Sequence, residues 1–294
     1  MQKPDEIPTE NNQKKTSSAR DMPECLHRPC WQALLLGLAA GSGGSLIGIG
    51  GGIIMVPVLT IWGLAQKKAQ GTSLVVILAL APVSTFLYWR LGNMDFGFAV
   101  PLAIGGVIGS MTGSSLALRF SNRVLAKLFA AFLVIIALRL LIRALFGSNA
   151  ESCTEVELRT LVDYLETTGF GFLAGLTAGF FGVGGGVVFV PTGVILGGLQ
   201  QCLAQGSSFT AMIPTAFVAT MNYRDQREIA WKLAYWMIPG AWAGAILGSW
   251  AADVLAKIRD GQVLTVIFAL FLVYTGVSRL INNWNKAPAG ASSK

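Results

Sequence analysis

The sequence predicts an all-α integral membrane protein of about eight transmembrane helices, built as two homologous four-helix halves with broken glycine-rich helices. Three observations predict this fold. The composition is 53% hydrophobic and only 13% charged. Apolar stretches long enough to cross about 30 Å of hydrocarbon follow one another along the chain. A glycine-dense decamer occurs twice, as GIGGGIIMVP at residues 48–57 and GVGGGVVFVP at residues 182–191.

The apolar stretches set the number of crossings. Those without a charged residue or histidine cover residues 32–66, 69–89, 96–118, 169–223 and 233–252, and shorter ones cover residues 128–138 and 263–277. Residues 31–64 would be about 50 Å long as a single helix, so this stretch must tilt, kink, or break and fold back. An even number of crossings in each half makes the repeats parallel, and an odd number inverts them.

Polar segments separate and flank the two halves. We expect a disordered polar tail at residues 1–30, a first transmembrane repeat at 31–146, a polar connection at 147–168, a second repeat at 169–284 and a C-terminal tail at 285–294. The first tail has no apolar core of the kind that a signal peptide needs. In the connection, Leu158, Leu161, Val162 and Leu165 follow helical spacing, which predicts a short helix on the membrane surface.

The repeat extends beyond the decamers. AQGTS at residues 69–73 matches AQGSS at 204–208, and STFLYWR at 84–90 matches ATMNYRD at 219–225. Along the chain, the offset between matching segments drifts only from 134 to 139 positions. Duplicated membrane halves are the architecture of secondary transporters, which hold their substrate between the repeats near the midplane.

The net charge of +7 fits membrane orientation better than nucleic-acid binding, because the basic residues lie between the apolar spans. Four crossings per half would gather two groups of basic residues at opposite faces. One face would hold the two tails, Arg90, Arg143, Arg159, Arg224, Arg227 and Lys232, and the other Lys67, Lys68, Arg119, Arg123, Lys257 and Arg259. The larger first group predicts a multi-pass protein of the cell (inner) membrane with both termini in the cytoplasm.

The glycine decamers are the first candidate site. Three consecutive glycines followed by a proline predict a helix break, and a break at membrane depth exposes backbone groups that need a partner. A half-helix that starts after such a break aims free N–H groups at it, which suits an anion. We expect the two decamers to meet near the midplane and to face a shared cavity. The candidate binding residues are Gly50, Gly51, Gly52, Pro57, Gly184, Gly185, Gly186 and Pro191.

Close helix packing is the alternative for these glycines, since Gly44, Gly48 and Gly52 also form a row of small residues. Packing is the preferred interpretation for the rows Gly105, Gly109, Gly113 and Gly240, Gly244, Gly248. These rows lack three consecutive glycines. We therefore expect Gly109→Ala to be comparatively mild.

The duplicated AQG[TS]S segments add polar side chains to the candidate substrate site. Their amide and hydroxyl donors suit an oxyanion, although hydroxyls that bond their own helix backbone would explain the pattern as well. The residues are Gln70, Thr72, Ser73, Gln205, Ser207 and Ser208. Arg90 and Arg224 follow in the same segments and are candidates for an anion funnel or for interfacial anchors.

Paired GIGGG and GVGGG decamers, each followed by an A-x-G-[TS]-S segment, resemble the sulfite exporter TauE/SafE family, also called the toluene sulfonate uptake permease family. The resemblance covers about residues 33–281. It implies a secondary carrier of small sulfur-containing anions such as sulfite, sulfonates or sulfoacetate, working in export. A passive anion channel, or an uptake permease for a related anion, is the alternative.

Other function classes find little support. The sole histidine is His27, and the spans contain no paired carboxylates, so we expect no enzyme activity, cofactor or metal. Ile53 and Val187 stand where a dinucleotide fingerprint needs glycine. The apolar spans also lack titratable acids, which predicts a carrier without a proton relay of its own. The sequence leaves the oligomeric state open.

Overall fold

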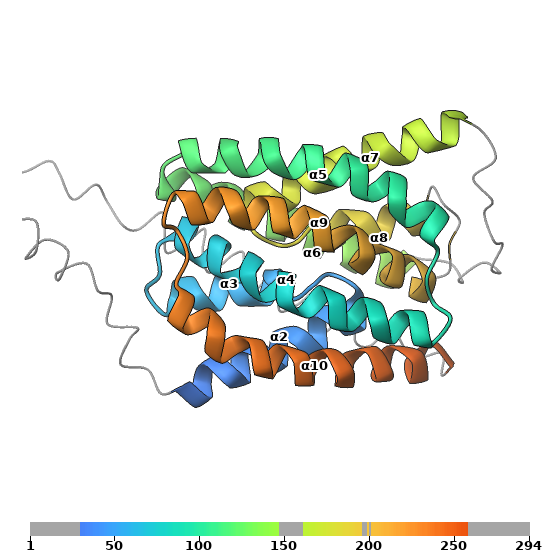
Figure 1. Ribbon diagram of the computed structural model, residues 1–294, viewed down its shortest axis with the longest axis horizontal. Helices are drawn as coiled ribbons and strands as arrows, with labels where there is room; N and C mark the ends of the chain where they lie inside the picture. Colours follow the sequence, from blue (N-terminus) through green and yellow to red (C-terminus); the bar gives the residue numbers. More distant parts are fainter. Residues whose placement is uncertain (1–29, 147–160, 196–198, 200, 258–294) are drawn as a thin grey trace, which may run out of the picture.

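The computed structural model describes residues 30–146, 161–195, 199 and 201–257, and the elements in them are α-helices (Figure 1). The helices of the first half are α2 (Cys30–Ile47), α3 (Gly52–Ile61), α4 (Gln66–Arg90), α5 (Phe96–Arg119) and α6 (Asn122–Phe146). Those of the second half are α7 (Leu161–Phe181), α8 (Gly186–Ile195), α9 (Gln201–Asp225) and α10 (Trp231–Lys257). The all-helical membrane fold is therefore confirmed.

Both predicted helix breaks are present, between α2 and α3 and between α7 and α8. Their backbone enters the left-handed region, which residues with a Cβ adopt only at a cost. In the first break the φ angles are +80° at Gly48, +80° at Gly50 and +76° at Gly51. In the second they are +69° at Gly182, +83° at Gly184 and +83° at Gly185. The consecutive glycines are required because the chain turns here at membrane depth.

Helices α2 and α3 form a re-entrant hairpin. Four residues link Ile61 to Gln66, a reach of at most about 14 Å, so α3 ends where α4 begins. Helix α2 starts at that same end of the molecule, since it runs parallel to α10, with Gly240 against Leu34 and Gly248 against Ser42. In Figure 1 the chain accordingly enters and leaves this hairpin on the left, and α7 and α8 form the matching hairpin from the right.

The two halves are inverted. Helices α4 and α9 are equivalent in the repeat and pack against each other in opposite directions, because Gln70 meets Tyr223 and Tyr88 meets Gln205. Equivalent helices run antiparallel only when the repeat axis lies in the membrane plane. The described part of the first half thus contains one hairpin and three crossing helices. This odd number of crossings refines the predicted four per half.

Helices α4 and α9 lie at the centre, with α5 and α10 beside them, α7 against α5, and α2 against α10. Glycine rows allow the close packing of the outer pairs, as expected. A Cβ at Gly109 would overlap the carbonyl oxygen of Phe172 and lie 2.7 Å from the amide nitrogen of Leu176. The expectation that Gly109→Ala is mild therefore does not hold, because the neighbouring backbone leaves no room.

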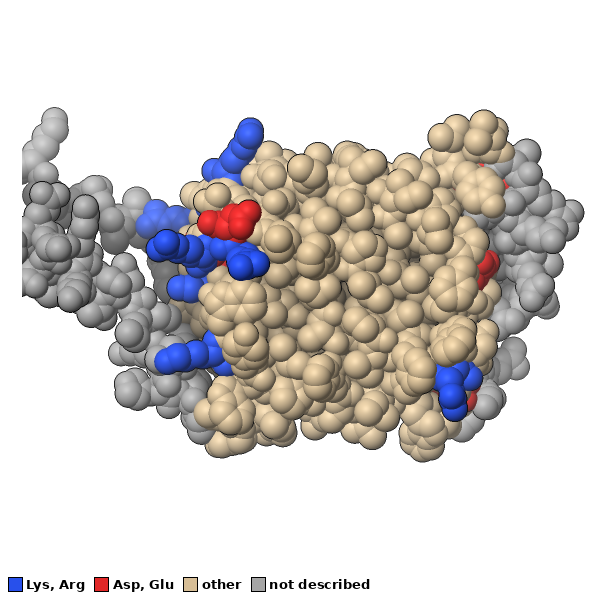
Figure 2. Space-filling view, in the orientation of Figure 1, with Lys and Arg blue, Asp and Glu red and all other residues tan. Residues whose placement is uncertain are grey.

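Lys and Arg gather at one end of the molecule, on the left in Figure 2. We call this the basic end; α4, α6 and α10 begin there, and α5 and α9 end there. The residues in these turns and connections are Lys67, Lys68, Arg119, Arg123, Lys127, Arg224, Arg227 and Lys232. The predicted grouping by faces was wrong, because the hairpin brings Lys67 and Lys68 to the same end as Arg224. Arg90 lies at the opposite end.

The connection between the halves is shorter than predicted. Helix α7 runs without interruption from Leu161, so the predicted boundary at residue 169 falls inside it. The rest of the predicted surface helix, in residues 147–160, lies outside the described residues, as do most of the two tails.

Candidate functional site

The two breaks lie against each other, as the duplicated decamers predicted. A Cβ built on Gly52, the first residue of α3, would lie 2.6 Å from the Cα of Val183 in the opposite break. The contact is reciprocal, because Gly186 at the start of α8 faces the Gly48 carbonyl and Ile49. The first N–H groups of both short helices therefore converge on the region between the repeats, and a helix start has no intrahelical partner for them. Two positive helix ends meet here.

Two apolar side chains fill the centre of the crossing. A Cβ on Gly184 would lie 2.6 Å from Cε of Met212 and 3.0 Å from Cγ2 of Ile77, and Gly50 faces the same two side chains. Ile77 and Met212 are equivalent in the repeat and are fully buried. The glycine loops thus border an apolar plug at the position where the sequence predicted a shared cavity.

The glutamine of each AQG[TS]S segment contacts the break of the other half, and a tyrosine holds it there. We call each pair of tyrosine and glutamine, together with the backbone carbonyl that the tyrosine contacts, a clasp. In the first clasp, the Tyr88 hydroxyl lies 2.7 Å from the Ser45 carbonyl oxygen and 2.9 Å from Oε1 of Gln205. Nε2 of Gln205 also donates to the Leu46 carbonyl at 3.2 Å. The first clasp therefore ties the end of α2 to α9.

The second clasp is its repeat equivalent at the basic end. The Tyr223 hydroxyl lies 3.1 Å from Oε1 of Gln70 and 3.2 Å from the Gly179 carbonyl oxygen. Here Nε2 of Gln70 is buried without a hydrogen-bond partner. A Cβ on Gly182 would lie 2.6 Å from Cβ of Gln70, so this free amide lies beside the second break. The two clasps are alike in design and unequal in hydrogen bonding.

The predicted hydroxyls divide into two groups. The first group is engaged by backbone: Thr72 donates to Lys68 and accepts from the amide of Ala230, which precedes α10. Ser207 forms the equivalent contact with the backbone of Asp95, the N-cap of α5. Ser208 donates to its own helix at Ala204. These contacts position the helix starts of the opposite half.

Ser73 belongs to the second group, since its hydroxyl is buried and has no partner. Gln66 has two further buried atoms without a partner, Nε2 and Oε1, and sequence reasoning missed this residue. Its position four residues before Gln70 is the signal that could have found it, because such spacing places both on one helix face. The two prolines, Pro57 and Pro191, lie inside α3 and α8.

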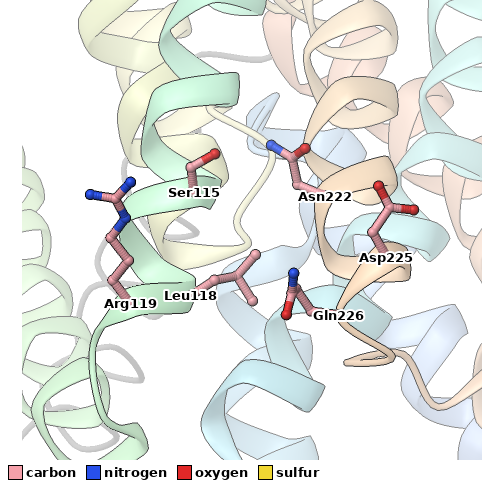
Figure 3. Close-up of a pocket in the computed structure, with 6 residues that line it drawn as sticks. All are labelled: Ser115, Leu118, Arg119, Asn222, Asp225 and Gln226. Carbon is pink, nitrogen blue, oxygen red and sulfur yellow. The ribbon is translucent and has the colours of Figure 1, made fainter.

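The two candidate funnel arginines lie apart, with Arg224 at the basic end and Arg90 at the opposite end. A groove of about 310 Å³ opens between α5 and α9 at the basic end. Figure 3 shows Ser115 and Leu118 of α5 facing Asn222 of α9 and Gln226 in the turn after α9. Arg119 and Asp225 complete its lining, so the arginine that lines this groove is Arg119 and neither of the two predicted funnel arginines.

Inverted repeats with crossing re-entrant hairpins define a class of multi-pass membrane protein, that of secondary transporters with a central site. The family model for the sulfite exporter TauE/SafE matches residues 33–200 and 167–294, two overlapping segments that together cover both halves. The chain belongs to the sulfite exporter TauE/SafE family.

Relatives carry names of the same kind. The chain is 28% identical over 266 residues to the probable membrane transporter protein YunE of Bacillus subtilis, covering 83% of this chain and 97% of the relative. It is 28% identical over 252 residues to a probable membrane transporter protein of Xylella fastidiosa, covering 85% and 93%. No solved structure matches the chain. The protein is thus a membrane transporter.

Proposed function

We propose that the protein is a secondary carrier that exports small sulfur-containing anions and binds them where the two hairpins cross. The observation that carries this proposal is the crossing itself, because each glycine break lies against the start of the opposite short helix. The N–H groups of α3 and α8 supply positive ends without a fixed cation. Membership of the sulfite exporter TauE/SafE family supports sulfite as the first anion to test.

The donors available at the crossing suit an oxyanion. Gln70 and Ser73 each have a buried donor without a partner, on the side of α4 that borders the second break. A buried donor that stays unpaired costs about 1–3 kcal/mol, so an anion that accepts from both recovers that loss. Thr72, Ser207 and Ser208 would act on the same anion indirectly, through the helix starts and backbone that they hold.

Inverted repeats explain how such a site can open to either side in turn. The two clasps are symmetry equivalents at opposite ends of α4 and α9, so opening one while the other stays closed exposes the crossing to one side only. Ile77 and Met212 block the centre. This plug favours a gated carrier over the alternative of a passive channel, which needs a continuous path.

The basic end faces the cytoplasm in this proposal. Among the described residues, eight Lys and Arg residues lie in the turns and connections at the basic end, against Arg90 and Lys257 at the last residues of α4 and α10 and Arg139 and Arg143 near the end of α6. Cytoplasmic ends of membrane proteins carry the excess of Lys and Arg. Helix α2 begins at the basic end, so the start of this helix is cytoplasmic. For the two termini, which lie outside the described residues, we retain the predicted cytoplasmic side.

A ligand screen by thermal unfolding of the detergent-purified protein tests the proposal. Sulfite, sulfate, thiosulfate, taurine, sulfoacetate and sulfolactate are compared. A ligand at 100 times its Kd stabilises the folded state by about 2.7 kcal/mol, which raises Tm by about 5–10 °C. Gly185→Val should abolish the shift, because Gly185 has φ +83° and lies against Phe189. Gly169→Ala is the matched control, since a Cβ there meets nothing within 4 Å. Absence of a shift with all six anions would contradict the proposal.

A further inference from the structure

The first half carries a row of buried polar atoms on α4. Gln66, Gln70 and Ser73 lie at i, i+4 and i+7 on α4, within about 60° of the helix circumference. Their exposed fractions are 4%, 0% and 0%. Four of their polar atoms have no hydrogen-bond partner: Nε2 and Oε1 of Gln66, Nε2 of Gln70 and Oγ of Ser73. We call these three residues the α4 polar stripe.

The stripe leads from the basic end to the crossing. Gln66 is the first residue of α4, Gln70 lies beside Gly182, and Ile77 on the same face reaches the plug. At the equivalent positions of α9, Gln205 has its amide bonded to Leu46 and Ser208 bonds its own backbone. The fold therefore does not require unpaired atoms at the positions of Gln70 and Ser73. Buried polar groups are paired in almost all native proteins, so four in one row indicate a place for a bound partner.

The chemistry of the stripe selects among anions. It offers neutral donors from two amides and a hydroxyl, together with one acceptor, Oε1 of Gln66. Lys67 and Lys68 are neighbours of the stripe on α4, and the Lys67 ammonium donates to the Leu118 carbonyl on α5. Across the packed helices, Glu228 contributes its backbone carbonyl next to Gly71. A doubly charged anion would be costly to bury among neutral groups, and it has no hydrogen for the Gln66 acceptor.

On the basis of the proposed function, we propose that the α4 polar stripe is a binding lane for a singly charged, protonated oxyanion, with hydrogen sulfite as the probe. Such an anion accepts from the amides of Gln66 and Gln70 and from Ser73, and donates its O–H to Oε1 of Gln66. Because both atoms of the Gln66 amide are unpaired, this amide offers one donor and one acceptor in either orientation. The substrate thus brings its own proton from the basic end.

Binding of two monoanions to the full-length protein tests this assignment. Hydrogen sulfite has an O–H, and methanesulfonate has none and keeps its charge across neutral pH. Wild-type protein should bind sulfite more tightly as the pH falls and hydrogen sulfite becomes the main species. Methanesulfonate should bind with an affinity that does not change with pH and that is weaker than the affinity for sulfite at low pH, where hydrogen sulfite predominates. Gln66→Leu should remove the preference for hydrogen sulfite. Ser73→Ala should weaken both anions about fivefold, the effect of one neutral hydrogen bond.

Gly169→Ala is the control variant and should leave both affinities unchanged, because a Cβ there meets nothing within 4 Å. If wild-type protein binds sulfite equally at all pH values, or if Gln66→Leu keeps the preference, the lane is wrong and the carrier proposal stands. If wild-type protein binds neither anion, the carrier proposal fails first. Folding of each variant is checked by its unfolding transition without ligand, where Ser73→Ala should be as stable as wild type.

Discussion

Replacing Tyr88 and Tyr223 by phenylalanine, one at a time, should show whether each clasp only stabilises the fold or also supports transport. In the first clasp the Tyr88 hydroxyl lies 2.7 Å and 2.9 Å from two buried acceptors. Both distances fall within the usual O–H···O range of about 2.5–3.0 Å. Hydrogen bonds between membrane helices average about 0.6 kcal/mol and reach about 1.7. Loss of this hydroxyl should therefore cost about 1–2 kcal/mol.

The second clasp gives the contrast. The Tyr223 hydroxyl is 3.1 Å and 3.2 Å from its two acceptors, beyond the usual range, so Tyr223→Phe should cost about half as much. The assay is thermal unfolding in detergent, where about 2–4 °C of Tm correspond to 1 kcal/mol. Sulfite flux into proteoliposomes is measured in parallel, and Tyr223→Phe should reduce it more than its stability loss explains, since this clasp positions Gln70. A larger Tm loss for Tyr223→Phe than for Tyr88→Phe would refute this reasoning.

Three further predictions concern packing, the plug and the driving force. Gly109→Ala should lower Tm, because overpacking costs about 1–3 kcal/mol, while Gly169→Ala should not; equal Tm values would contradict the packing. Ile77→Ala combined with Met212→Ala should produce an anion leak in proteoliposomes, and an unchanged leak would show that the plug is not the barrier. At equal pH on both sides, sulfite efflux should follow an imposed potassium-diffusion potential, worth about 2.3 kcal/mol per charge per 100 mV; a flux that ignores it would contradict electrogenic export.

The sequence was sufficient for the helical membrane fold, the duplication and the broken helices, because hydropathy and glycine runs are local signals. It did not reveal the inversion. Whether residues 31–64 cross the membrane or fold back depends on where α3 packs, which local composition does not encode. The predicted grouping of the basic residues was wrong for the same reason, because the end at which Lys67 and Lys68 lie depends on whether residues 31–64 cross or fold back.

At the site, the glycines were predictable because the breaks need positive φ angles, which residues with a Cβ adopt only at a cost. The partners of the polar side chains were not. Gln70 and Gln205 contact the breaks of the opposite halves, a relation that appears only when inverted repeats interlock. Gln66 escaped notice because it lies outside the duplicated AQG[TS]S segment. Thr72 and Ser207 fit the binding pattern in the sequence, although the structure engages their hydroxyls with helix starts.

Counterflow of radiolabelled sulfite in proteoliposomes tests the central claim most directly, namely that the crossing hairpins hold one anion at a time and expose it to alternate sides. Vesicles loaded with unlabelled sulfite are diluted into a trace of labelled sulfite. We expect transient accumulation of label inside the vesicles, saturable with sulfite concentration and absent in Gly185→Val, while Gly169→Ala behaves as wild type. A flux that rises linearly with concentration and shows no accumulation would contradict it, because a pore does not couple entry to exit.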